Sequence, residues 1–217
     1  MGGEVPDPEW IPLAGDADDT PASAPVRKRI LEEGEGALPT EGSTMELEYT
    51  GTLFGEKGWS VKDVAQCWLA ELQGLNHFSP QFAEQEIDGE KLMNASFFTE
   101  EYCTEDLGAS NKIQAKKLVM ASKRLIRQQA EYPAGSEFDA SKSRGKNYAF
   151  ALGQGKVIRA MELAVRSMRV GERAEVVCRS DYAYGAEGLR TAKGEVIVPP
   201  FAVLCFDLKL VRATPTA

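Results

Sequence analysis

The chain has 217 residues, enough for one large domain or two small ones, each with a buried core. Its hydrophobic fraction of 43% and charged fraction of 27% are typical of globular proteins and argue against a disordered chain. The net charge of -8 argues against nucleic-acid binding by the whole surface, and no apolar run approaches the roughly 20 residues that span a membrane.

Residues 1–25 are acidic, lack Lys and Arg, and show no sustained hydrophobic period, so they are predicted to form a disordered tail. Their only apolar group is Trp10, Ile11 and Leu13, which either docks on the folded part or serves as a short linear motif. The N-terminus has neither the basic nor the apolar region of a secretion signal. The four cysteines form no C-x-x-C pair, so we expect reduced core residues and a location in the cytoplasm or the nucleus.

A β pattern begins at Val26, and Met45, Leu47 and Tyr49 then alternate with polar residues as in a half-buried strand. The period changes at "WSVKDVAQCWLAEL", where Ser60 and Asp63 have the spacing of a capping box at the start of an amphipathic helix over 60–72. Shorter helices are predicted over 81–86, 89–95 and 100–107. A long helix is predicted over 111–129, after a Gly108 stop and a Ser110 or Asn111 cap. One face of it is expected to be largely apolar and to contain Ala115, Leu118, Val119, Ser122, Leu125 and Ile126.

The β pattern resumes after "EYPAG", where "GSEFDAS" is the return strand of a hairpin whose first strand ends near residue 54. Further strands are predicted around 172–179 and 202–211, with one short helix over 157–168 between them. Exposed hairpin tips tolerate insertion of a domain with neighbouring termini. The predicted organisation is a tail over 1–25, a discontinuous β-rich domain over 26–56 and 133–213, an inserted helical domain over 57–130, and a tail over 214–217.

The β-rich domain contains no histidine, because His77 is the only one in the chain and lies in the insert. A histidine-based catalytic triad or a multi-histidine zinc site is therefore excluded there, and we expect no metal and no cofactor. An unusual number of aromatic residues remains, and they either fill the core or line a pocket: Tyr49, Phe138, Tyr148, Phe150, Tyr184 and Phe206.

The motifs "EFDASKSRG", "GQGKVIRAMELAV", "SDYAYGAEG" and "VPPFAVLCFDLKLV" resemble, in this order, the FKBP family of peptidyl-prolyl cis-trans isomerases. The resemblance implies an α+β fold in which a bent antiparallel sheet wraps over one short helix. It also implies isomerisation of X-Pro bonds in an aromatic pocket, without nucleophile or base, by desolvation and twisting of the amide.

The family's site residues match particular positions of this chain. Tyr184 matches a hydroxyl donor, the N–H of Ile158 a second donor, and Asp139 a buried carboxylate that pairs with Arg144 and Tyr49; the alternative is a loop salt bridge without catalytic meaning. The residues assigned to catalysis are Tyr49, Phe138, Asp139, Tyr184 and Phe206. Those assigned to substrate binding are Arg144, Tyr148, Val157, Ile158, Met161, Leu189, Ile197 and Val198.

Two departures from the family affect the expected activity. Met161 stands where the family usually has a Trp pocket floor, which implies a reduced isomerase rate and weakened binding of macrolides of the tacrolimus and rapamycin type. Leu189 stands where His is common, and the following segment is longer than usual, so partner choice at the rim is expected to differ.

The insert motifs "WSVKDVAQCWLAEL", "FAEQEIDGEKLMNAS" and "LGASNKIQAKKLVMASKRL" resemble a sterile alpha motif (SAM) domain, a five-helix bundle that serves protein–protein interaction. The long helix carries six basic residues and no acid between 112 and 127, while acidic stretches precede it. This segregation indicates either a solvated surface or contact with SAM partners or another copy in open chains. RNA binding is the weaker alternative.

Two functions therefore remain. The first is a prolyl isomerase acting on proline-containing polypeptides and presented by its SAM insert, and the residues Asp139, Tyr184 and Phe138 favour it. The second is a weakly catalytic or non-catalytic proline-binding scaffold whose main role is SAM-mediated assembly, and Met161 favours it.

Overall fold

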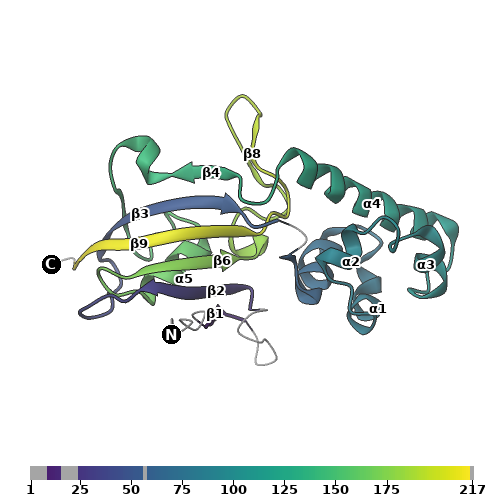
Figure 1. Cartoon of the computed structure of the whole chain (residues 1–217), viewed down its shortest axis with the longest axis horizontal. Helices are drawn as coiled ribbons and strands as arrows, with labels where there is room; N and C mark the ends of the chain where they lie inside the picture. Colours follow the sequence, from purple (N-terminus) through teal and green to yellow (C-terminus); the bar gives the residue numbers. More distant parts are fainter. Residues whose placement is uncertain (1–8, 16–23, 56–57, 216–217) are drawn as a thin grey trace, which may run out of the picture. The chain divides into compact units, whose positions relative to one another are not determined.

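The computed structural model describes residues 9–15, 24–55 and 58–215. A seven-stranded sheet has the order β1-β2-β6-β9-β3-β4, with β5 paired to β3 (Figure 1). Its strands are β1 (Ile11–Ala14), β2 (Val26–Glu32), β3 (Thr44–Leu53), β4 (Glu137–Ala140), β5 (Tyr148–Ala151), β6 (Arg173–Cys178) and β9 (Leu204–Thr214). The pairs β1–β2, β2–β6 and β3–β5 are antiparallel. The fold is therefore α+β with an antiparallel sheet, as predicted.

Alternation along the strands creates the core of this sheet. Met45, Leu47 and Tyr49 of β3 are buried while their neighbours are partly or fully exposed, and Phe206, Leu208 and Leu210 repeat the pattern on β9. The helix α5 (Arg159–Arg166) lies behind the sheet in the view of Figure 1. Its buried residues are Ala160, Met161, Ala164 and Val165. The sheet and one short helix thus form the two layers of the α+β arrangement that the sequence predicts.

A buried ion pair joins β2 to the turn before β6. The Lys28 Nζ lies 2.7 Å from the Glu172 Oε1, and the two side chains are only 4% and 3% exposed. Lys28 also donates to the carbonyl of Ser167, and the second Glu172 oxygen accepts the backbone N–H of Arg169. These additional hydrogen bonds give both buried charged groups further partners, which offsets part of the cost of removing them from water.

Part of the N-terminal segment is ordered, and its apolar group docks on the folded part, which was one of the two alternatives for that group. Ile11–Ala14 form β1, which pairs with β2 at the edge of the sheet, and Trp10 lies against the guanidinium groups of Arg27 and Arg29 at 5.2 and 5.1 Å. Cation–π contact and strand pairing give this short segment the partners that its own sequence lacks. Residues 1–8 and 16–23 of the predicted tail lie outside the described residues.

The region between β3 and β4 is helical. Its α-helices are α1 (Ser79–Glu84), α2 (Gly89–Met93), α3 (Glu100–Glu105) and α4 (Lys112–Glu131), with short turns at η3 (Leu69–Glu71) and η4 (Asn76–Phe78). The Asn111 side chain caps α4 by accepting the N–H of Gln114, and Gly108 takes the left-handed conformation that ends the preceding segment. On α4 the residues Ala115, Leu118, Val119, Ser122 and Leu125 are buried, which confirms the predicted apolar face.

The first helix of this region differs from the expected α-helix. The predicted capping box is present, because Ser60 donates to the Asp63 carboxylate and its hydroxyl accepts the Asp63 N–H. The following residues, however, form a π-helix, η2 (Asp63–Trp68), in which the N–H of Leu69 reaches the carbonyl of Val64. Apolar spacing over so few residues does not reveal whether an N–H bonds four or five residues back.

Backbone hydrogen bonds close the base of the helical region. The N–H of Gly135 donates to the carbonyl of Leu53, and the N–H of Leu53 donates to Ser136. Chain contacts divide the molecule into two compact units. We call them the sheet unit (described residues up to Gly51, Asp139–Cys178 and from Cys205) and the helical unit (Thr52–Phe138 and Arg179–Leu204). The segment 179–204, which includes η6 (Ser180–Tyr182), β7 (Leu189–Arg190) and β8 (Val196–Val198), thus belongs with the helices.

Within the described part of the chain, no helix combines the length and the apolar character that membrane crossing requires. All four cysteines are free thiols, and Cys103 and Cys178 are buried. Burial raises the pKa of Cys103 to about 12, so this thiol is protonated at neutral pH.

Candidate functional site

The sheet unit contains the carboxylate cluster that the sequence predicts. The Tyr49 hydroxyl donates to the Asp139 Oδ2 at 2.6 Å. Arg144 donates to both Asp139 oxygens at 2.7 and 2.8 Å and to the Tyr49 oxygen at 2.6 Å. Asp139 lies on β4, while Arg144 ends the 3-10 turn η5 (Ser141–Arg144), so one tight turn brings the two charges together.

The predicted burial of Asp139 is wrong. Its side chain is 34% exposed and that of Arg144 is 43% exposed, because both lie where β4 turns into η5 at the edge of the sheet. Tyr49 is the buried member of the cluster. Burial and the hydrogen bond to Asp139 raise the pKa of Tyr49 to about 12, so its hydroxyl remains a donor at neutral pH.

Tyr148 of β5 extends this cluster. Its ring meets the Tyr49 ring edge-on, with centroids 5.9 Å apart, and the Arg144 guanidinium lies 5.6 Å from the Tyr148 centroid. Arg144 therefore binds a carboxylate and covers two aromatic rings at once. The sequence prediction assigned Tyr148 to a pocket wall, and its half-buried position leaves part of the ring accessible.

The residues before α5 present one backbone donor. Ile158 precedes the helix in an extended conformation and is half-buried, as is Val157. Within the described residues, no group accepts a hydrogen bond from the N–H of Ile158. This N–H is one of the donors that a helix N-terminus leaves without an intrahelical partner, so it is available to a ligand. Met161 of α5 and Phe206 of β9 are both buried, at 6% and 3% exposure.

The remaining predicted site residues belong to the helical unit. The Phe138 ring meets the Tyr184 ring edge-on, with centroids 6.4 Å apart and an interplanar angle of 89°. Leu189 of β7 pairs with Val198 of β8 in a two-stranded hairpin. Leu189, Ile197, Phe138 and Tyr184 are half-buried, and Val198 is buried. The structure thus joins Phe138, from the end of the helical insert, to the loop that contains Tyr184.

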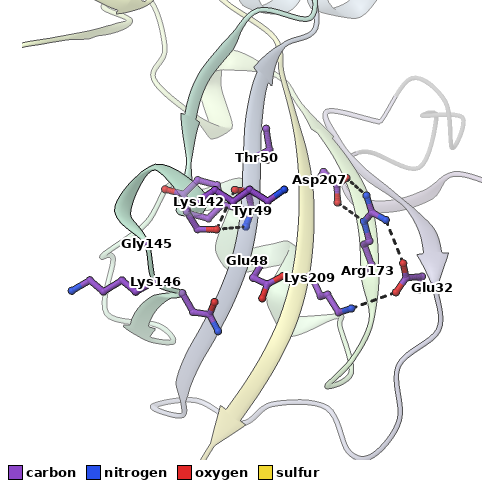
Figure 2. A pocket seen from close by; sticks show the side chains of 12 residues that line it. Glu32, Glu48, Tyr49, Thr50, Lys142, Gly145, Lys146, Arg173, Asp207 and Lys209 are labelled. Carbon is purple, nitrogen blue, oxygen red and sulfur yellow. Dashed lines mark hydrogen bonds and ion pairs between the residues drawn. The ribbon is translucent and has the colours of Figure 1, made fainter.

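The sheet unit also has a cavity of about 570 Å³ that sequence reasoning did not predict. Figure 2 shows Lys142 and Lys146 on one side and the ion pairs of Arg173 with Asp207 and Glu32 on the other. Of the predicted site residues only Tyr49 lines it, and most of the lining is charged. This cavity therefore lacks the character of a dry aromatic slot. The sequence did contain one signal for this cavity: alternation along the strands places charged residues on the outer face of the sheet.

Sequence reasoning also missed how the segment 179–204 is held. The Cys67 Sγ lies 3.0 Å from the Ser180 hydroxyl, and Arg179 lies 4.0 Å from the Asp63 carboxylate. The Gln128 side chain on α4 donates to the carbonyl of Pro200 at 2.9 Å. These contacts join residues far apart in the sequence, so no local sequence pattern predicts them.

Comparisons with known proteins identify two family matches. Residues 114–211 match FKBP-type peptidyl-prolyl cis-trans isomerase, and residues 56–126 match the SAM domain (sterile alpha motif). The SAM match lies between β3 and β4, which are neighbours in the sheet.

The chain is 44% identical over 78 residues to the Xenopus laevis peptidyl-prolyl cis-trans isomerase FKBP1A, covering 36% of this chain and 68% of that protein. It is 38% identical over 78 residues to the Drosophila melanogaster Fkbp12 isomerase, with the same coverage. For FK506-binding protein 59 of Drosophila melanogaster the identity is 43%, over 35% of this chain and only 16% of the relative. The N-terminal domain of FKBP42 from Arabidopsis thaliana is similar in structure, with a TM-score of 0.46, 18% identity, and coverage of 94% of this chain and 98% of that one.

The chain belongs to the FKBP-type peptidyl-prolyl cis-trans isomerase family and contains a SAM domain.

Proposed function

We propose that this chain is an active peptidyl-prolyl cis-trans isomerase whose SAM domain, inserted in a β-hairpin of the isomerase domain, connects it to other proteins. Family membership and the Tyr49–Asp139–Arg144 cluster support this proposal, and the cluster is the observation that carries it. The discontinuous isomerase domain over 26–56 and 133–213, and the insert over 57–130, are part of the proposal. Four free thiols are consistent with action in the cytoplasm or nucleus.

The proposed mechanism lowers the barrier without covalent chemistry. Amide resonance sets a barrier of roughly 18–20 kcal/mol for rotation about an X-Pro bond. A twisted amide has lost this resonance, so a water-poor site lined by Phe138, Phe206 and Tyr148 favours it over the planar form. The cluster of Arg144 with Asp139 and Tyr49 holds one wall of this site in a single conformation.

Two donors complete the proposed mechanism. The N–H of Ile158 has no described acceptor and would bind a substrate carbonyl. The Tyr184 hydroxyl would bind a second one, with its ring oriented by the edge-on contact with Phe138. Held at two carbonyls, the peptide adopts a turn-like shape, and the remaining rotation is confined to the X-Pro bond.

Met161 is proposed to form the pocket floor. A thioether side chain is flexible and smaller than an indole, so it holds a proline ring, or a macrolide of the tacrolimus and rapamycin type, less firmly. We therefore propose a moderate isomerase rate and weak macrolide affinity. The rim residues Leu189, Ile197 and Val198 would select among proline-containing polypeptides.

The second candidate function is a proline-binding scaffold in which catalysis is weak or absent and assembly through the SAM domain dominates. The observation that favours it is the same Met161, which is buried in α5. In both cases the SAM domain would bind SAM partners or other copies of the chain through its segregated charges. A salt-insensitive monomer at high concentration would contradict self-association.

The deciding experiment measures X-Pro cis/trans exchange by NMR line-shape analysis on a peptide panel. We expect the wild type to accelerate exchange and Met161→Trp to accelerate it further. Tyr184→Phe should slow exchange about tenfold, because one hydrogen bond contributes about 1 to 1.5 kcal/mol. Catalysis seen only in Met161→Trp would support the scaffold instead. Binding without exchange in every variant would contradict the isomerase proposal.

A further inference from the structure

A shallow groove of about 380 Å³ runs between helix α4 and the segment that follows β8. It lies entirely within the helical unit. One wall is formed by the last two turns of α4, and the other by Val196, Pro199 and Pro200. The hydrogen bond from Gln128 to the Pro200 carbonyl joins the two walls at 2.9 Å. The groove is therefore a fixed feature of this unit rather than a gap between loops.

The helix wall of the groove is positively charged. Arg124 and Arg127 line it, and both are exposed. Among the described residues neither has a carboxylate partner, and Arg127 makes one long hydrogen bond, from its Nε to the carbonyl of Lys123. Two guanidinium groups one turn apart on a helix face offer planar donors suited to carboxylates.

Glu131 is the single acid among the residues that line the groove. Burial and this neighbouring carboxylate raise the pKa of Tyr132, while the charge of Arg190 lowers it. The Tyr132 ring and the two prolines supply apolar surface between the charges.

The groove adjoins the proposed isomerase site along the chain. Val198, a proposed wall residue of that site, immediately precedes the groove residues Pro199 and Pro200. An extended chain advances about 3.3–3.6 Å per residue. A polypeptide whose proline sits beside Val198 would therefore place its next few residues at the groove.

We propose that this groove is a substrate subsite that selects proline-containing polypeptides with acidic side chains two to five residues from the isomerised proline. The proposal rests on the proposed isomerase function and adds a substrate class to it. Charge complementarity argues for an acidic peptide, and the Tyr132 and proline surface argues for an extended one. The SAM helix α4 would thereby contribute to catalytic specificity in addition to partner binding.

The test compares exchange rates on matched peptides that differ only in flanking residues: Asp, Asn or Lys at positions two to five from the proline, on either side. For the wild type we expect kcat/KM for the best Asp peptide to exceed that of its Asn counterpart about threefold to tenfold, and the Lys peptide to be poorest. This ratio should decline as salt rises, because exposed charges are screened.

The variant Arg124→Gln with Arg127→Gln should bring the Asp-to-Asn ratio close to one. The matched control is Lys116→Gln with Lys117→Gln, which removes two exposed charges from the same helix outside the groove and should keep the ratio of the wild type. Circular dichroism of all three proteins checks that α4 remains folded. An Asp preference absent from the wild type, or unchanged in the double Arg variant, would overturn the proposal.

Binding measured separately distinguishes failure of the subsite from failure of the isomerase. NMR chemical shifts of Gln128, Val196 and Tyr132 report peptide binding without turnover. Shifts caused by the Asp peptide and lost in the double Arg variant would support the groove even if no peptide were isomerised. A short single-stranded RNA that displaces the Asp peptide, with no Asp preference in exchange, would overturn the peptide assignment in favour of RNA.

Discussion

The sheet unit and the helical unit differ in the interactions that stabilise them and in the segments of the sequence that form them. The sheet unit combines strands with a buried ion pair, Lys28 with Glu172, and its site cluster is electrostatic. The helical unit has an aromatic core in which Phe82 contacts both Trp68 and Phe98. It also includes the segment 179–204, which lies inside the isomerase family match rather than the SAM match.

This difference shows that a family boundary and a packing boundary need not coincide. The segment 179–204 is part of the isomerase sequence, but Ser180, Arg179 and Pro200 bond to residues of the SAM helices. Five of the predicted site residues, from Phe138 to Val198, consequently belong to the helical unit. A change in the SAM core is therefore expected to reach the isomerase loop before it reaches the sheet.

Replacing the buried Phe82 by Ala should have the largest effect. Loss of a fully buried ring typically costs about 4 kcal/mol of unfolding free energy. We expect faster amide exchange in the helices and at Gly185 and Phe201, whose N–H groups bond within the loop, while Val176 and Leu208 of the sheet stay protected. Hydrogen exchange followed by NMR measures all these amides.

Two outcomes of that experiment would contradict the view that the loop depends on the helices and that the sheet unfolds separately. Equal loss of protection in β6 and β9 would mean that the molecule unfolds as one cooperative body. Unchanged protection of Gly185 would mean that the loop does not depend on the helices. The exposed Met120→Ala on α4 is the matched control and should alter neither region by more than a few tenths of a kcal/mol.

Glu172→Gln should have the next largest effect and should act on the sheet unit. Removing one charge leaves Lys28 buried without its counterion, at a cost of about 3 kcal/mol. Urea denaturation followed by circular dichroism measures the loss. The exposed pair of Arg173 with Asp207 is the control, because Arg173→Gln should cost less than about 1 kcal/mol. Equal losses for both variants would argue against a buried pair.

The smallest expected effect concerns Tyr49 and alkaline pH. Its folded-state pKa of about 12 lies above the usual tyrosine pKa of about 10, so the neutral hydroxyl is the form that the fold stabilises. This contribution is complete below pH 10 and is lost as the pH rises through 10 toward 12. Absorbance titration should show late tyrosine ionisation near pH 12 that is reduced in Tyr49→Phe. An identical titration curve in the variant would contradict the cluster geometry.

Local patterns predicted most of the fold. Alternation along β3, β6 and β9, the Ser60–Asp63 capping box and the apolar face of α4 all reflect interactions within a few residues, and the structure contains each of them. The contact of Asp139 with Arg144 and Tyr49 was predicted by family resemblance. Its exposure was not, because burial depends on the packing of β4 and η5 at the sheet edge.

Features that depend on distant partners escaped prediction. Docking of Ile11 and Leu13 was one of two alternatives, but the strand Ile11–Ala14 was not predicted, because its pairing with β2 depends on the edge that β2 presents. The π-helix over Asp63–Trp68 follows an apolar pattern that an α-helix would also satisfy. The groove beside α4 needs Arg124 and Pro200 from positions more than 70 residues apart, so it emerges only in three dimensions.

The two hydrogen bonds between Leu53 and the 135–136 turn have a consequence for the route to the folded state. Without a folded insert, pairing β3 with β4 would require closing a loop of about 80 residues, at an entropy cost near 4 kcal/mol. The helices are built from local contacts and form quickly. Once they have folded, their two ends meet, and the distant strands become neighbours as if joined by a short hairpin. Folding of the insert thus brings together the two strands, β3 and β4, that precede and follow it in the sequence.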